Sequence, residues 1–486
     1  MGSTILFFDD WHLAQRVSVD RHIGQPRTAG KFVDPYGDIA FAYPTVFKDQ
    51  ESGRWRCLYQ NFLYDKFIHP DDVVTRGGGE LLNRSVPVVI ESDDALNWRI
   101  PDLTDTVPLR DRRTPHQILP LDKFREWGPA FYDERAEDPS ERIKGFVSFG
   151  KDQLDPIAPL WVSPDGIHWK HQEGAAWHPI GIDPAITAHW NPLRQSYVIA
   201  ARPAWGDRRM AVYETTDWVN YSKPELALQA DALDTPMAEI YGMPVFPYED
   251  NFVGFTWMFH PDQDLVSRPG KGYLGTNDCQ LAYSFNGSHF QRGLRDPFVP
   301  NAEPGEDGGA VIYPTSLVRD GDMLRICSSG GRLEHGEGLG SPENPQSALL
   351  FQELRLDGFV YLQSAGGWGN ITTRIMFANG PELNMNVLAP HGIVQAQVMD
   401  DTGEPIEGYS FEDCIPFTGD NVRWSPEWRD GRRFGGIGKR IVRLGVRMLN
   451  ARLYAIRGNF HPIASMDRAL FEEKGTEPPP ISTYWS

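Results

Sequence analysis

The sequence has few cysteines, and no two of them lie close together in the chain. The four residues are Cys57, Cys279, Cys327 and Cys414, so no Cys-x-x-Cys pair occurs. Zinc clusters and thiol–disulfide motifs depend on such pairs, and the spacing therefore indicates neither. Free cysteine usually packs as a small apolar side chain. We expect four buried thiols, no disulfide framework and no structural metal.

Long apolar segments are also missing. No run of about 18 apolar residues occurs, and a membrane-spanning helix needs that length, so we expect no membrane partner. The first residues, MGSTILFFDDWHL, hold an apolar run that is too short for a signal peptide and has no basic residues before it. We therefore expect a cytoplasmic protein.

Positive charge is scarce. The chain has 47 Lys and Arg against 66 Asp and Glu, which gives a net charge of −19. Nucleic acids and anionic membranes attract basic surfaces, so this balance argues against either as a partner and agrees with an uncharged substrate. The segment GGIGKR at Gly435 lacks the spacing of a phosphate-binding loop, and no cofactor is indicated. A homo-oligomer is compatible with the sequence.

Glycine, proline and aromatic residues are abundant, and one turn pattern recurs. The chain has 47 Gly and 39 Pro, which favour many turns and short strands over long helices. In the turn pattern, the third residue is Asp or Asn, whose side chain can bond to the backbone two residues on, and the seventh is aromatic. The five copies are SDDALNW from residue 92, SPDGIHW from 163, TTDWVNY from 215, SFNGSHF from 284 and RLDGFVY from 355.

A group of three apolar segments precedes each turn, and a proline lies at the entry to the first segment. Proline is tolerated at the first residue of a strand because no ladder donor is lost there. With the segment that follows the turn, each unit has four antiparallel strands. Five such units predict an all-β chain with a five-bladed β-propeller. The entry prolines are Pro44, Pro129, Pro184, Pro244 and Pro314.

The pattern changes near residue 366. We expect residues 1–365 to form the propeller, with the N-terminal strand TILFFDD completing a blade and closing the ring. From 366 to 460, apolar and polar residues alternate between turns, which predicts a β-sandwich. Residues 461–486 are expected to form a Pro-rich, extended C-terminal tail.

This domain order resembles the furanosidase group of glycoside hydrolases, especially families 32, 43 and 68. The segment from GNITTRIMFANGPELNMNV to RLYAIRG is similar to the sandwich of family 32, and SPDGIHW resembles turns of many propeller glycosidases. The NDPNG, RDP and ECP motifs of family 32 are missing, so the resemblance implies an outlying member. It also implies a glycosidase that removes a terminal furanose unit, fructosyl or arabinosyl, from a glycan.

Glycoside hydrolysis normally uses two carboxyl groups, one that protonates the leaving oxygen and one that acts as base or nucleophile. The inner strands of a propeller converge at one mouth of the channel, so acids near the entry prolines can meet. We expect Asp38 to be the nucleophile or base and Glu239 to be the general acid. Asp183, in GIDPAIT, resembles the Asp-Pro strand entry of family 43, where a third Asp orients the acid. Further acids near strand entries are Asp34, Glu126, Glu306 and Asp307.

Several other side chains near this mouth are expected to contact the sugar. They are Tyr43, Glu126, His189, Arg202, Tyr241, Trp257, His260 and Asp307. His335 lies on a Gly-rich loop, but no second His stands at ligand spacing, so we expect no metal site.

Two alternative functions stay open. The first is phosphorolysis, in which clustered cations would hold phosphate in place of a water-activating base. Its candidates are Arg202, Arg208 and Arg209. The second is a carbohydrate-binding propeller without catalysis, which is favoured if the channel mouth holds only one acid.

Overall fold

Strands make up nearly all of the regular secondary structure in a computed structural model of the chain. It describes residues 2–69, 73–76, 79–82, 85–120, 126–127, 129–148, 157–179, 186–262 and 274–484. Within these ranges α1 (Ser465–Lys474) is the only α-helix, which confirms the all-β class. Short 3-10 helices are η1 (Asp65–Phe67), η2 (Pro139–Glu141), η3 (Arg429–Gly431), η4 (Phe434–Ile437) and η5 (Ile481–Tyr484).

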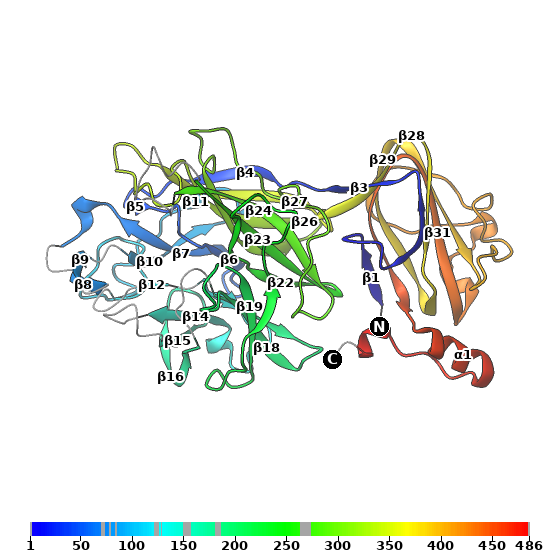
Figure 1. The fold of residues 1–486 in the computed structure, drawn as a ribbon, viewed down its shortest axis with the longest axis horizontal. Coiled ribbons are helices and arrows are strands. Elements are labelled where there is room, and N and C mark those ends of the chain that lie inside the picture. Colours follow the sequence, from blue (N-terminus) through cyan, green and yellow to red (C-terminus); the bar gives the residue numbers. More distant parts are fainter. Residues whose placement is uncertain are drawn as a thin grey trace. The chain divides into compact units, whose positions relative to one another are not determined.

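The chain divides into two compact units, whose elements are labelled in Figure 1. The larger unit comprises residues 26–247 and 252–353, and the smaller unit comprises residues 1–25, 248–251 and 354–486. This division differs from the predicted one at 365/366, because the start of the chain belongs to the smaller unit.

The predicted ring-closing strand is therefore wrong. TILFFDD contains β1 (Ser3–Leu6), which pairs with β31 (Arg440–Pro462) of the smaller unit, where Ile5 and Phe7 are fully buried. The strand that joins the last sheet of the larger unit is instead β4 (Arg27–Phe32), which pairs with β27 (Ser347–Arg355). Its sequence, RTAGKF, is polar and partly exposed, as an outermost strand can be.

Antiparallel sheets make up the larger unit, and the first three of them follow the predicted order of strands. The first has the order β11–β10–β7–β5, with β6 also on β7; the second is β12–β14–β15–β16, with β13 also on β14; the third is β17–β18–β19–β20. Their strands are β5 (Gly37–Asp38), β6 (Thr45–Lys48), β7 (Trp55–Leu63), β10 (Ser85–Ser92), β11 (Trp98–Arg99), β12 (Glu126–Trp127), β13 (Phe131–Tyr132), β14 (Ile143–Ser148), β15 (Ala158–Ser163), β16 (Lys170–Trp177), β17 (Thr187–Asn191), β18 (Ser196–Ala201), β19 (Met210–Thr215) and β20 (Glu225–Leu228).

The fourth and fifth predicted units share one sheet of eight strands. A single parallel bridge, between Asn277 and Val311, joins its two halves. The number of blades therefore stays a prediction. The further strands of this sheet are β21 (Glu239–Gly242), β22 (Val245–Tyr248), β23 (Asn251–Pro261), β24 (Gly275–Ser284), β25 (Val311–Asp320) and β26 (Met323–Gly331), and a separate hairpin pairs β8 (Val73–Arg76) with β9 (Gly79–Leu82).

Four of the five recurring turns have the hydrogen bonds that their composition predicts. One side-chain oxygen of the third residue accepts from the backbone N–H groups two and three residues on, and the Ser or Thr at the first position accepts from the third residue's N–H. These third residues are Asp94, Asp165, Asp217 and Asn286. In the fifth turn, Asp357 is buried and accepts instead from Tyr248, Asn386 and Arg457.

The smaller unit is a sheet of long strands around a buried core that includes Trp428 and Met385. The predicted tail is not extended throughout, because β31 continues to Pro462 and α1 follows. The helix ends at Gly475, whose φ of 67° suits a left-handed C-terminal cap. The strand order is β2–β28–β31–β29–β30, with β1 on β31 and β3 on β28. The remaining bounds are β2 (Leu13–Val17), β3 (Asp20–Ile23), β28 (Val360–Thr373), β29 (Met376–Met399) and β30 (Phe417–Trp424).

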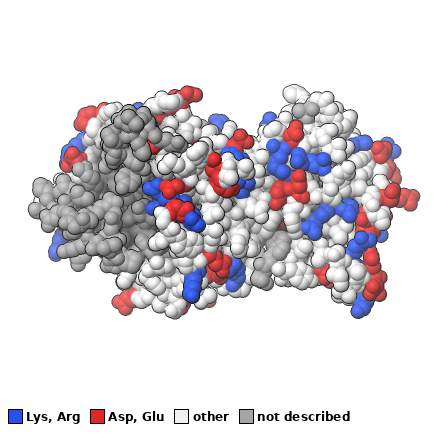
Figure 2. Space-filling view, in the orientation of Figure 1, with Lys and Arg blue, Asp and Glu red and all other residues white. Residues whose placement is uncertain are grey.

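Three further features bear on function. All four cysteines are free and buried, as predicted. Among the residues with a described position, no helix is long and apolar enough to cross a membrane, and no group of three His, Cys, Asp or Glu side chains is arranged to hold a metal ion. Figure 2 shows basic and acidic side chains interspersed on the visible face, with no single basic region there.

Candidate active site

The candidate site lies where the inner strands of the larger unit begin. Antiparallel pairing sets the first residue of an inner strand beside the end of the second strand. Asp38 pairs with Phe62 of β7, and Glu239 pairs with Phe259 of β23. We call these strand starts, together with the described residues that directly follow β7, β18 and β26, the strand-entry end.

An aromatic cluster joins the inner strands near this end. The rings of Trp257 and Tyr43 stack with centroids 5.5 Å apart, and Tyr313 meets both edge-on. Trp257 is completely buried and donates from Nε1 to the backbone oxygen of Pro314 at 3.0 Å. Gly242 lies against its indole, where a Cβ would come within 2.5 Å of the ring. Trp257 and Tyr43, which we expected to contact sugar, are therefore packing residues, because neither ring is exposed.

Two arginines from the loop between β18 and β19 reach Tyr241, at the edge of this cluster. The guanidinium carbons of Arg202 and Arg208 lie 5.4 and 5.6 Å from the ring centroid of Tyr241. Arg208 also lies 4.9 Å from the centroid of Phe259 and donates to Oε2 of Glu239 at 2.6 Å. The backbone holds this loop in place, since the N–H of Ile240 donates to the carbonyl of Arg208 at 3.0 Å.

Glu239, the predicted general acid, is partly exposed. Its side chain is 30% exposed, so its carboxylate can be reached from solvent. Arg208 is an immediate neighbour, and no local sequence pattern indicates this pairing because the two residues are 31 positions apart.

His335 lies beside Tyr241. Its Nε2 is 3.2 Å from the Tyr241 hydroxyl, and its ring packs against Phe41, Tyr241 and Phe259. Its backbone N–H donates to the carbonyl of Gly275 at 2.9 Å. The sequence suggested His335 only as a possible metal ligand. In the structure it contacts Tyr241 and Phe259, the two residues that Arg208 also contacts.

Asp38 lies on the same segment as Phe41, and its carboxylate is buried. Oδ1 accepts from the N–H of Ala40 at 3.0 Å and from the hydroxyl of Ser347 at 2.9 Å, and Oδ2 accepts from the N–H of Gly340 at 2.9 Å. Gly340 belongs to the loop between β26 and β27, which also carries His335. That loop would have to move before Asp38 could reach a sugar.

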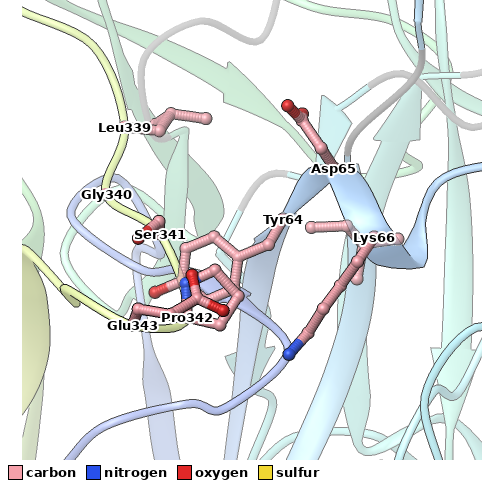
Figure 3. Close-up of a pocket in the computed structure, with 9 residues that line it drawn as sticks. Tyr64, Asp65, Lys66, Leu339, Gly340, Ser341, Pro342 and Glu343 are labelled. Carbon is pink, nitrogen blue, oxygen red and sulfur yellow. The ribbon is translucent and has the colours of Figure 1, made fainter.

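A cavity of about 590 Å³ lies beside Asp38. Figure 3 shows that its lining comes from the segment after β7, with Tyr64 and Lys66, and from the loop with Leu339 to Glu343. Burial and the charges of Asp38 and Asp34 raise the pKa of Tyr64 to about 12, so its hydroxyl stays protonated and can donate a hydrogen bond. The volume lies within the roughly 300–1,000 Å³ of small-molecule sites.

Two other acids near strand entries have structural partners. Asp34 is fully buried and accepts from the hydroxyl of Tyr59 at 2.6 Å, with Nε2 of His116 at 3.1 Å. Asp307 accepts from Lys31 at 2.7 Å and from Arg332 at 2.8 Å. Burial raises the pKa of the Asp307 carboxyl, but the bonds to these two cations outweigh it and lower the pKa. Asp307, predicted to bind sugar, instead ties β4 to the loop after β26.

The two predicted histidines differ in their surroundings. His189 is buried against Phe252, with ring centroids 5.3 Å apart, and burial lowers its pKa to about 3. It is therefore a core residue and not the expected sugar contact. His260 is partly exposed; its Nε2 lies 3.0 Å from Asp278 and its Nδ1 lies 3.0 Å from the Thr235 hydroxyl. It stays a candidate for binding.

The structure does not test the predictions for Asp183 and Glu126, and it places one further aromatic residue, Trp205, near the candidate site. Asp183 lies outside the described residues, and only the backbone of Glu126 is described. Trp205 is 42% exposed on the loop between Arg202 and Arg208, at the strand-entry end. Nothing in its local sequence set it apart from the other tryptophans.

Searches of protein families and of curated protein sequences find no match for this chain. Solved structures with a similar fold include an N-acetylgalactosamine deacetylase from F. plautii (13% identity, TM-score 0.44, covering 70% of this chain and 97% of that one). A β-1,2-mannobiose phosphorylase from Listeria innocua has 10% identity and a TM-score of 0.44 over 70% of this chain and 98% of that one. A GH32 β-fructofuranosidase from Bombyx mori has 12% identity and a TM-score of 0.41 over 88% of this chain and 94% of that one. Similarity at this level does not establish a function, which has to follow from the residues of this chain.

Proposed function

We propose that this chain is a glycoside hydrolase with its active site at the strand-entry end of the larger unit. The observation that carries the proposal is the exposed carboxylate of Glu239, framed by Arg208 and the ring of Tyr241. An aromatic ring can pack on the apolar face of a sugar, and a carboxyl beside it can serve as acid.

In this mechanism Glu239 donates a proton to the glycosidic oxygen while the bond to the anomeric carbon breaks. Asp38 attacks that carbon or takes a proton from the attacking water, and Asp183 orients the acid.

We further propose that the substrate is a glycan with a terminal furanose unit, fructosyl or arabinosyl, and that the enzyme acts from the chain end. The support is the cavity beside Asp38, which is large enough for a small glycan and is lined by Tyr64.

The test compares Glu239→Gln with Glu404→Gln, an exposed acid of the smaller unit, on aryl furanosides and natural oligosaccharides. Glu239→Gln keeps the shape of the side chain but cannot donate the proton. We expect a loss of about 10²–10⁴-fold on the natural glycoside and a smaller loss on the activated aryl substrate, which needs less protonation. Glu404→Gln should behave as wild type.

Two results would contradict these roles. Near-wild-type turnover of the natural glycoside by Glu239→Gln would remove this residue from the mechanism. An equal loss on both substrate types would indicate that Glu239 is the nucleophile or an orienting group, with its role exchanged with that of Asp38.

The convergence of Arg202 and Arg208 on Tyr241 favours a second candidate, phosphorolysis. Phosphate would then attack the anomeric carbon in place of water and yield a sugar phosphate. Arg209 is not part of this pair, because it binds Asp207 at the surface. The discriminating measurement is turnover with and without inorganic phosphate. Turnover that requires phosphate supports this candidate, whereas sugar binding without any turnover supports a carbohydrate-binding protein.

A further inference from the structure

The smaller unit carries an exposed tryptophan at a bulge in β28. Ser364 pairs with Ala451 of β31 and Trp368 pairs with Leu449, so three residues of β28 lie opposite one residue of β31. Gly366, in this bulge, has a φ of 72°, a conformation that glycine adopts without strain. Bulges re-aim the side chains next to them. Here the indole of Trp368 is left 47% exposed.

Arg447 lies over this indole and belongs to a frame of three polar side chains, with Gln395 and Glu412. The guanidinium carbon of Arg447 lies 5.5 Å from the ring centroid of Trp368 and 4.8 Å from that of Phe411. Arg447 donates from Nε to the side-chain oxygen of Gln395 at 2.9 Å and from Nη1 to Glu412 at 3.1 Å. An arginine has five N–H donors. These two bonds therefore orient the group and leave it donors for a ligand.

The combination fits a sugar better than it fits an apolar partner. A single exposed apolar side chain is ordinary on a protein surface, but this one lies beside a donor, Arg447, which in turn bonds to an acceptor, Glu412. A sugar has an apolar C–H face that can stack on an indole and a rim of hydroxyls that need both donors and acceptors. Arg447 and Glu412 carry opposite formal charges, so the frame as a whole favours a neutral ligand.

We propose that Trp368, Arg447 and Glu412 form a binding surface for a neutral polysaccharide chain. It lies on the smaller unit and uses none of the residues of the candidate active site. A second binding surface on the same chain raises the effective concentration of a polymeric substrate. It gives no advantage on a small aryl glycoside.

The experiment is electrophoresis of the full chain through native gels that contain arabinan, inulin or xylan. We expect at least one polysaccharide to retard the wild type, and Trp368→Ala to bind it roughly tenfold more weakly, the effect of losing one aromatic contact. Arg447→Gln should also weaken binding. The control is Met466→Ala, an exposed apolar residue on α1 of the same unit, which should migrate as wild type.

The outcomes separate this surface from the active site. Trp368→Ala should keep its thermal midpoint and its rate on any small aryl glycoside that the wild type cleaves. Trp368→Tyr retains a ring and should retain part of the retardation, which keeps the test valid if the alanine variant folds poorly. The proposal is overturned if none of the three polysaccharides retards the wild type, or if Trp368→Ala is retarded equally. It is also overturned if this substitution turns an oligomer into a monomer in light scattering, because the surface would then bind a second copy.

Discussion

Arg208 donates a 2.6 Å hydrogen bond to the carboxylate of Glu239, across two sheets of the larger unit. The arginine comes from the loop before β19 and the acid from the start of β21, so neighbouring sheets meet at the candidate acid. The same guanidinium lies over the ring of Phe259 at 4.9 Å. A hydrogen bond in this position can fix the orientation of the candidate acid.

Replacing Arg208 by Met should lower activity. The 2.6 Å bond from Arg208 holds the carboxylate of Glu239 in place, and a hydrogen bond to a charged group contributes about 1.5–3 kcal/mol. We therefore expect kcat/KM to fall roughly tenfold or more. Arg209→Met, at the surface next door, is the matched control. An unchanged kcat/KM in Arg208→Met would show that this pair does not position the acid.

Tyr64→Phe tests the cavity beside Asp38. The raised pKa of Tyr64, about 12, keeps its hydroxyl a donor throughout the assay range. Loss of one such bond to substrate costs about 0.5–1.5 kcal/mol, so KM should rise about two- to tenfold with kcat nearly unchanged. Tyr484→Phe, an exposed tyrosine of the smaller unit, should leave both constants unchanged. A fall in kcat with constant KM would contradict a role in binding alone.

His189 should make the protein less stable in acid. Burial lowers its pKa from 6.5 to about 3, so between these values the unfolded chain binds a proton that the folded chain does not. Stability from this group is full above pH 6.5 and is lost as the pH falls towards 3, at about 1.4 kcal/mol per pH unit. Between pH 6.5 and 5, the unfolding free energy of His189→Leu should therefore fall by about 2 kcal/mol less than that of wild type. Urea unfolding at both pH values measures this.

The matched control for His189 is His171→Leu, because His171 is exposed. It should leave the acid dependence of the unfolding free energy as in wild type. If His189→Leu and wild type lose the same free energy over this range, His189 is not neutral in the folded protein.

Asp357 should make the smaller unit sensitive to loss of Arg457. Asp357 is buried, and its carboxylate accepts from Arg457 at 2.6 Å and from the Tyr248 hydroxyl at 2.6 Å. Arg457→Met leaves a buried charge without its cation and should cost about 3–5 kcal/mol. The double variant Asp357→Asn/Arg457→Met removes both charges and should cost clearly less. Chemical denaturation measures the loss of unfolding free energy in both variants. Equal losses would show that the unpaired charge of Asp357 is not what destabilises Arg457→Met.

The recurring turns were predicted well from the sequence because they depend on hydrogen bonds between neighbouring residues. Asp94 and Asp217 form their turns through bonds that reach three residues or fewer, so the residue types suffice. Asp357 occupies the same place in the pattern, yet its partners lie 29 to 109 positions away and leave no local signal. Similarly, β1 and β4 are both short strands near the start of the chain. β1 is buried in the smaller unit and β4 is a partly exposed strand of the larger unit, and the sequence does not show this difference.

The candidate site was predictable to a smaller extent for the same reason. Glu239 was predicted because it stands at the start of an inner strand, a local property, and its catalytic role stays a prediction. The roles of Tyr43, Trp257 and His189 were wrong, because a sequence shows that a ring is near a strand entry but not which face of the sheet covers it. Arg208 and His335 are far from Tyr241 in the chain, and only the fold brings them into contact with it.

The pairing of β4 with β27, and of β1 with β31, also has a consequence for synthesis on the ribosome. Residues 3–32 are made before their partner strands, which span residues 347–355, 360–373 and 440–462. Neither unit can complete its sheet until most of the chain has left the exit tunnel. We therefore expect the first thirty residues to wait as an unpaired segment, accessible to chaperones, while the sheets between them assemble.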